Sequence, residues 1–162
     1  MNVMSHRNPS DSLPDEVLAM LGVHQIFWRV QECVDELREN DDQAVVQALS
    51  KQEKHVIILL GSPQRMGVLA REMTALPSTI TSIADGLEEK LLLERIRDPA
   101  DRRAFLLRLT GDGEEIRRTM VQKVSEMFRS ISGLSPEETE AFAKLANKAR
   151  RNILDHETPE GI

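Results

Sequence analysis

The sequence contains few of the residues that build disulfide-rich, aromatic-rich or membrane-spanning proteins. Its 162 residues include one cysteine, one tryptophan, four phenylalanines and no tyrosine. A single cysteine excludes a disulfide within the chain. Aliphatic side chains must therefore fill the core, which favours helices over aromatic-rich sheets. No apolar run approaches the roughly 20 residues that a membrane span needs, and the N-terminus lacks the apolar segment of a signal peptide, so we expect a cytoplasmic protein.

The sequence also lacks the residue clusters that carry catalysis or bind metals. The four histidines, His6, His24, His55 and His156, are scattered, with no pair at metal-ligand spacing on one helix. No nucleophile is paired with a base, and no glycine-rich phosphate loop is present. We therefore expect no cofactor, no metal and no enzymatic activity.

Apolar residues recur at helical spacing over most of the chain. They predict helices over residues 14–39, 51–60, 64–73, 77–90, 112–132 and 136–156, with a further short helical segment within 43–49. Ser50 with Glu53, and Ser135 with Glu138, have the spacing of a capping box at a helix start. In the helix at 77–90, four apolar residues share one face and are expected in the core: Ile80, Ile83, Ala84 and Leu87.

Residues 91–110 have a different pattern, that of a β-hairpin with a long, charged tip. Apolar residues alternate with other residues along both arms, and residues 98–103 between them are too many for a two-residue turn. Residues 95–108 carry five arginines and two aspartates in a chain of net charge -6. An arginine held by a neighbouring aspartate suits a phosphate or a narrow minor groove. The alternative is that these charges only pair with one another on a solvated loop.

The order of these elements predicts a mainly α-helical fold with a small β-hairpin, a winged helix-turn-helix flanked by long helices. We assign residues 50–111 to the winged helix-turn-helix and 13–49 and 112–157 to dimerisation helices, because one copy of the middle segment is too small to bury their apolar faces. Residues 1–12 are a flexible N-terminus and 158–162 a tail. Residues 64–110 hold eight basic and seven acidic side chains, which leaves 13 basic and 20 acidic residues elsewhere.

The sequence resembles the MarR (multiple antibiotic resistance regulator) family of transcription factors. The residues that carry the resemblance run from Ser78 to Thr81, then 87–90, then 95–98, 101–103 and 109–110. The resemblance implies a homodimeric repressor that binds a pseudo-palindromic operator in double-stranded DNA and responds to a small aromatic or lipophilic effector. This chain differs from the family pattern in having no cation on the recognition helix and Leu91 where a glycine is usual.

The resemblance also implies roles for individual residues. Ser78, Thr79, Thr81 and Ser82 would face the major groove. Arg103 would enter the minor groove, oriented by Asp101, while Arg97 and Arg102 would approach the phosphates. The acidic end of the same helix, with Asp85, Glu88 and Glu89, leaves open an alternative, a winged-helix protein-interaction module with weak or no DNA binding.

Two groups on the first helix are candidates for sensing a signal. His24, Trp28 and Arg29 lie within about one and a half turns, in a region that borders the ligand pocket of the resembling family, and are suited to an aromatic carboxylate. The alternative is that Trp28 belongs to the dimer core and Arg29 is a surface charge. Cys33 is either a redox sensor or a small residue packed on the apolar face.

Overall fold

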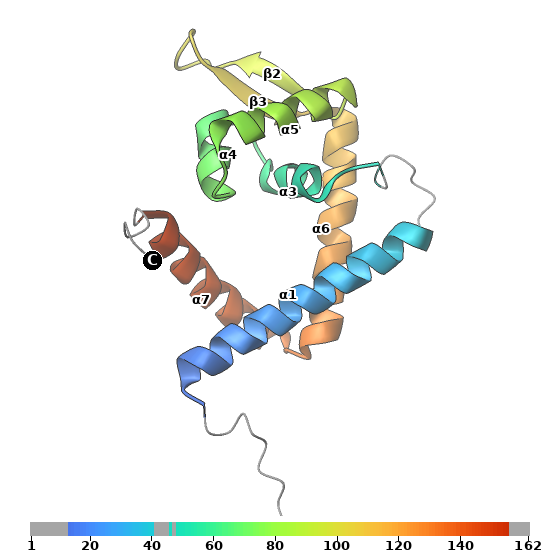
Figure 1. The fold of residues 1–162 in the computed structure, drawn as a ribbon, viewed down its shortest axis with the longest axis vertical. Helices are drawn as coiled ribbons and strands as arrows, with labels where there is room; N and C mark the ends of the chain where they lie inside the picture. Colours follow the sequence, from blue (N-terminus) through green and yellow to red (C-terminus); the bar gives the residue numbers. More distant parts are fainter. Residues whose placement is uncertain (1–12, 41–45, 47, 156–162) are drawn as a thin grey trace, which may run out of the picture.

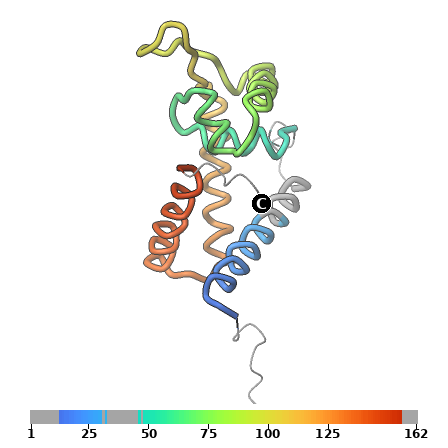
Figure 2. Tube along the Cα trace, turned by 60° about the vertical axis from the view of Figure 1, so that its left-hand side comes forward, coloured from blue at the N-terminus to red at the C-terminus, as the bar shows by residue number. Residues whose placement is uncertain are grey.

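The computed structural model describes residues 13–40, 46 and 48–155, the side chains of 31 and 33–40 excepted. A small lobe of short helices and a sheet occupies one end of the molecule, and three long helices occupy the other (Figure 1). These long helices are α1 (Asp15–Asn40), α6 (Gly111–Ser132) and α7 (Pro136–Asp155). Helix α6 extends away from the lobe, α1 crosses α6, and α7 runs back toward the lobe (Figures 1 and 2).

The small lobe contains three helices and a three-stranded antiparallel sheet. Its helices are α3 (Lys51–Leu59), α4 (Met66–Glu72) and α5 (Pro77–Glu89), and its strands are β1 (Gln64–Arg65), β2 (Leu93–Arg97) and β3 (Phe105–Leu109). The sheet order is β1-β3-β2, and in the hairpin Leu93 pairs with Leu109 and Arg97 with Phe105. The predicted fold, mainly helical with a hairpin wing, is confirmed.

The helix predicted from residue 64 was wrong at its start. Gln64 and Arg65 are extended and pair with Leu107 and Leu106 of β3, and the helix begins at Met66. A two-residue strand has no periodicity of its own. Its partner lies more than 40 residues further along the chain, so no local pattern indicates it.

The buried core lies in the lobe. Ile80, Ile83, Ala84 and Leu87 are buried, as the spacing predicted. Burial of each large aliphatic side chain stabilises the fold by about 1.5–3 kcal/mol. The other buried apolar residues come from the remaining parts of the lobe and the segment that leads into it: Leu49, Val56, Ile57, Leu60, Leu69, Ala70, Leu92, Leu93, Leu107 and Leu109. In α7, by contrast, all of whose residues are described, none is buried.

The predicted helix caps are confirmed. The amide of Glu53 donates to Ser50 Oγ at 3.2 Å, and the amide of Ser50 donates to Glu53 Oε2 at 2.7 Å. Ser135 and Glu138 exchange the same two bonds at the start of α7. Helix α6 is capped by Thr110, whose hydroxyl accepts from the amide of Gly113 at 3.2 Å.

A buried carboxylate joins α3 to the end of α5. Lys90 Nζ lies 2.5 Å from Glu53 Oε1. Burial alone raises the pKa of Glu53, but hydrogen bonds from Lys90 and Ser50 outweigh it and leave the pKa below its usual value. The pair therefore stabilises the lobe at pH values above the usual pKa of a carboxyl group. This contribution is lost as the pH falls through the lowered pKa of Glu53.

Leu91 joins α5 to the hairpin in a left-handed backbone conformation, with a φ of 59°. Its carbonyl accepts from Thr110 Oγ1 at 2.8 Å, while its side chain is 74% exposed and contributes little packing. A left-handed conformation costs a non-glycine residue about 1–2 kcal/mol. This geometry explains why glycine is usual at this position in the family that the sequence resembles.

Replacing Leu91 by glycine is therefore expected to stabilise the protein. The strain energy that is relieved exceeds the free-energy cost of a more flexible unfolded chain. We therefore expect the free energy of unfolding to rise by about 1 kcal/mol, or Tm by about 2–4 °C. Leu91→Ala is the matched control, since it removes the same side chain but keeps the strain, and it should leave Tm nearly unchanged. Thermal unfolding followed by circular dichroism compares the variants. A lower Tm for Leu91→Gly than for Leu91→Ala would contradict this explanation.

Among the helices of the described residues, none is both long and apolar enough to span a membrane. A search of the same residues for three or more His, Cys, Asp or Glu side chains able to hold a metal ion found no such group.

Candidate nucleic-acid interface

Helix α5 presents one polar face to solvent, opposite the face that it buries. Ser78, Ser82, Asp85 and Glu89 are exposed and recur at intervals of three and four residues, so they form one stripe along the helix. Thr81 is also exposed, on the flank toward α4, and Thr79 is half-buried. The hydroxyl residues predicted from the sequence therefore lie on or beside one surface, at the N-terminal half of the helix.

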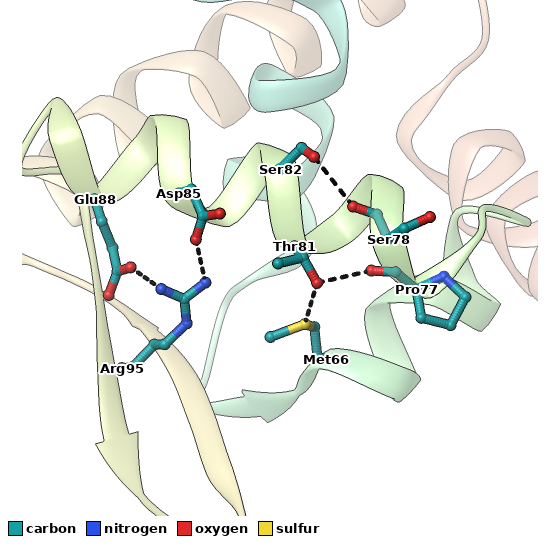
Figure 3. A network of polar contacts seen from close by, with 8 residues as sticks. All are labelled: Met66, Pro77, Ser78, Thr81, Ser82, Asp85, Glu88 and Arg95. Atoms are coloured by element: carbon teal, nitrogen blue, oxygen red, sulfur yellow. Dashed lines mark hydrogen bonds and ion pairs between the residues drawn. The ribbon is translucent and has the colours of Figure 1, made fainter.

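Two of these hydroxyls are bonded within the helix itself. Thr81 Oγ1 donates to the carbonyl oxygen of Pro77 at 3.0 Å and also lies 3.2 Å from the sulfur of Met66 (Figure 3). Ser82 Oγ donates to the carbonyl oxygen of Ser78 at 3.2 Å (Figure 3). Because each hydroxyl has one proton, it presents its free lone pairs to solvent and acts there as an acceptor.

An arginine of the hairpin neutralises part of the acidic end of α5. Arg95 of β2 places Nη2 2.6 Å from Asp85 Oδ1, and its Nη1 pairs with Glu88 (Figure 3). One guanidinium thus joins two carboxylates and fastens the helix to the first strand of the hairpin. This contact was not predicted from the sequence. The only signal for it was the acidic pair spaced three residues apart on the helix.

The hairpin loop is closed by its own backbone and by Asp98. The amide of Asp98 donates to the carbonyl oxygen of Ala104 at 3.0 Å, and the amide of Ala104 donates to that of Asp101 at 2.9 Å. The buried carboxylate of Asp98 accepts from the amide of Ala100 at 2.8 Å and from Arg65 Nε at 2.8 Å. These bonds, that of the Ala100 amide first, hold the pKa of Asp98 below its usual value.

Arg65 connects this loop to the helix-turn-helix. It lies directly before α4, and its Nη2 is 2.6 Å from Asp98 Oδ2 and 3.8 Å from Asp101 Oδ2. The ion pairs expected from the sequence all lay within the hairpin, so the contact of Arg65 with Asp98 was not predicted. The start of the hairpin loop is therefore anchored to the N-terminus of α4, the first helix of the helix-turn-helix.

The structure gives Asp101 a different contact from the one expected. Its Oδ1 accepts from the backbone amide of Arg103 at 3.1 Å, and the described residues contain no ion pair between Asp101 and the guanidinium of Arg103. The loop's own amide occupies that oxygen, as is common for Asp in turns. Asp101 therefore fixes the backbone at Arg103 and leaves its side chain free.

The tip of the hairpin carries two exposed guanidiniums, those of Arg102 and Arg103, which have no ion pair among the described residues. Arg97 lies nearer the base, where Nη1 donates to the carbonyl oxygen of Arg102 at 3.2 Å and the guanidinium stacks over the Phe105 ring at 5.9 Å. The alternative in which the charges of this loop only pair with one another therefore does not hold for Arg102 and Arg103. They remain available to an anionic partner.

The candidate sensor residues lie on α1, away from this surface. The rings of His24 and Trp28 stack with centroids 6.1 Å apart, and Arg29 pairs with Glu32 at 2.7 Å. A hollow of about 640 Å³ lies elsewhere, between the segment that follows α3 and the N-terminal half of α6, with Pro63, Arg117 and Val121 in its lining. The side chain of Cys33 is outside the described residues.

Comparison with known proteins shows which family the chain resembles. The sequence model of the MarR family matches residues 56–105, which include the last four residues of α3, the helix-turn-helix and the hairpin up to the start of β3. The resemblance read from the sequence is thereby confirmed over this segment, and the chain is similar to MarR-family transcriptional regulators, which are not enzymes.

Two relatives from Bacillus subtilis support this resemblance. The chain is 33% identical to the uncharacterised HTH-type transcriptional regulator YsmB over 54% of its own length and 61% of that protein. It is 28% identical to the HTH-type transcriptional repressor MdtR over 86% of its own length and 90% of that protein. The protein in the crystal structure of Streptococcus pneumoniae FabT in complex with DNA is 25% identical in sequence, and the two structures match with a TM-score of 0.62 over 87% of this chain and 99% of that chain.

Proposed function

We propose that this chain is a dimeric, sequence-specific DNA-binding repressor that responds to a small ligand. The observation that carries the proposal is the exposed polar face of α5 beside a hairpin whose tip carries the free guanidiniums of Arg102 and Arg103. Helix α5 enters the major groove, and the wing, the hairpin of β2 and β3, enters the minor groove. The similarity to FabT, solved with DNA, and to the repressor MdtR supports this proposal.

The arginines near the tip of the wing have two kinds of role in this arrangement. Arg103 enters the minor groove, where a narrow, electronegative groove attracts a guanidinium. Arg102 and Arg97 contact phosphates, and Asp101 sets the backbone from which Arg103 projects. Since the chain has a net charge of -6, attraction to DNA is confined to the wing, and binding should weaken steeply as salt rises.

A gel-retardation experiment with the DNA upstream of the chain's own gene tests this proposal. At about 50 mM salt we expect a saturable complex that survives an excess of scrambled competitor and weakens steeply toward about 200 mM. Absence of a complex at every salt concentration, from a chain shown to be folded and dimeric, would overturn it.

The unburied apolar side chains of the long helices support a dimer. Large apolar residues of α1, α6 and α7, and of the residues just before α1, are exposed in the isolated chain: Leu13, Val17, Leu18, Met20, Leu21, Val23, Phe27, Trp28, Val121, Leu145 and Ile153. Exposed large apolar side chains gathered on long helices are typical of a surface that a protein partner covers. A second copy related by a two-fold axis covers it and brings two wings and two recognition helices to the two halves of an operator.

The dimer can be tested with Leu145→Asp combined with Ile153→Asp. Both side chains are about 70% exposed in the single chain, so the substitutions should leave its fold intact. Each buried aliphatic side chain contributes about 1.5–3 kcal/mol at an interface, and four are lost in the dimer, so we expect the dimer Kd to rise more than about hundredfold. Light scattering measures the mass. Asn147→Asp on the same helix is the control and should remain dimeric, whereas a double variant that also remains dimeric would place the interface elsewhere.

The proposed effector is a small aromatic or lipophilic molecule that contacts His24, Trp28 and Arg29. The stacked pair of His24 and Trp28 supports an aromatic ligand, and the guanidinium of Arg29 suits its carboxylate. The alternative function, a winged-helix protein-interaction module, draws its support from the acidic residues of α5. The Arg95 contacts to Asp85 and Glu88 weaken that support, because they partly neutralise these charges.

A further inference from the structure

From Ser82 onward, the stripe of α5 that faces outward presents hydrogen-bond acceptors, whereas the hydroxyl of Ser78 at its start can still donate. Ser82 has committed its proton to the carbonyl of Ser78, and the flanking Thr81 has done the same with Pro77. Asp85 follows on the same face, and no arginine or lysine lies on the exposed part of the helix. Guanine presents only acceptors in the major groove, so its recognition requires a donor such as arginine. The part of the face from Ser82 to Asp85 is therefore suited to bases that present an amino group.

Asp85 is the acceptor that the structure fixes most firmly. Its side chain is 54% exposed, and its Oδ1 is held 2.6 Å from Arg95 Nη2. The other oxygen, Oδ2, has no hydrogen bond to any residue that the structure describes. Arg95 is the middle residue of β2 and binds Glu88 as well, so the carboxylate is held in place and its charge is partly balanced. A fixed, partly neutralised carboxylate can approach DNA at a lower electrostatic cost than a free one.

We propose that Asp85 reads one cytosine in each half of the operator by accepting a hydrogen bond from its N4 amino group, with Arg95 as the positioning residue. Among the bases, cytosine suits a single carboxylate oxygen best. Its amino group has only a C–H edge beside it, whereas the N6 amino group of adenine adjoins the acceptor N7. This inference rests on the proposed function, since it assumes that α5 lies in the major groove.

Selection from a randomised DNA pool with the full chain tests the inference. We expect the wild-type selection to contain one position per half-site that is strongly cytosine, where changing the C·G pair to G·C weakens binding by about tenfold or more. Asp85→Asn should reduce that discrimination to about twofold, because the amide offers a donor to guanine as well as an acceptor to cytosine. Arg95→Met should reduce it similarly, and Arg95→Lys should restore part of it.

Glu89→Gln is the matched control, since it removes an acidic group from the same stripe that has no arginine partner among the described residues. It should raise affinity for every sequence and keep the cytosine preference. Circular dichroism and light scattering confirm that each variant is folded and dimeric. If the wild-type chain selects no sequence, the proposed function and this inference both fail. If it selects an operator and Asp85→Asn keeps the full preference, only the inference fails.

Discussion

Replacing Arg103 by alanine is expected to weaken binding to operator DNA by tenfold or more. The guanidinium of Arg103 has no ion pair among the described residues, and the bond from its amide to Asp101 fixes the backbone from which it projects. No ion pair of the free protein has to break when this side chain moves into the minor groove. Most of the attraction between the guanidinium and the DNA therefore contributes to the binding affinity. Fluorescence anisotropy over a series of salt concentrations measures the loss, and each missing phosphate or groove contact should also lower the salt slope by about one.

Arg129→Ala is the control for this result. Arg129 is exposed on α6, near the end that is remote from the wing, and its replacement changes the net charge by the same amount. We expect its affinity to stay within about twofold of the wild-type value, because screening limits the effect of a distant charge. Equal losses for the two variants would mean that overall charge, and not the wing, governs binding.

Replacing Gly113 by alanine is expected to destabilise the lobe by about 2–4 kcal/mol. Gly113 is buried in the first turn of α6, where its amide donates to the capping hydroxyl of Thr110. A methyl group there would lie 2.1 Å from the carbonyl oxygen of Leu92 and 3.3 Å from Leu109 Cβ. The carbonyl is fixed by its bond from the amide of Thr110 at 3.1 Å, so it cannot move without breaking the junction between the hairpin and α6. Urea unfolding measures the loss as a lower midpoint.

Gly111→Ala, two residues earlier, is the matched comparison. A methyl group at Gly111 meets no atom within 4 Å, and alanine is the better helix former, so stability should stay the same or rise by up to about 1 kcal/mol. If Gly113→Ala unfolds at the same urea concentration as Gly111→Ala, the packing described for this junction is wrong.

The parts of the fold that the sequence predicted are those set by local periodicity and capping. The four buried residues of α5, the alternation along the hairpin and the capping boxes of α3 and α7 each depend on residues within a few positions of one another. The sequence also predicted that the flanking helices expose apolar side chains, because residues 50–111 are too few to cover the apolar faces of these helices.

The contacts that position the candidate interface could not be predicted in the same way. Arg65 reaches Asp98 across 33 residues, and Arg95 reaches back to Asp85 across ten. Which arginine finds which carboxylate depends on the packed lobe and not on the spacing of charges in the chain. The expected pairing of Asp101 with the side chain of Arg103 illustrates the limit, since the backbone amide of the same residue takes that oxygen instead.

Hydroxyl-radical footprinting of the chain on the DNA upstream of its own gene tests the account most directly, because this reagent reports on the minor groove that the wing is proposed to enter. We predict two protected segments related by the pseudo-two-fold axis of the operator, and we predict that Arg103→Ala loses this protection while remaining folded and dimeric. Protection that is absent, that lacks the two-fold relation, or that is unchanged in Arg103→Ala would contradict the account.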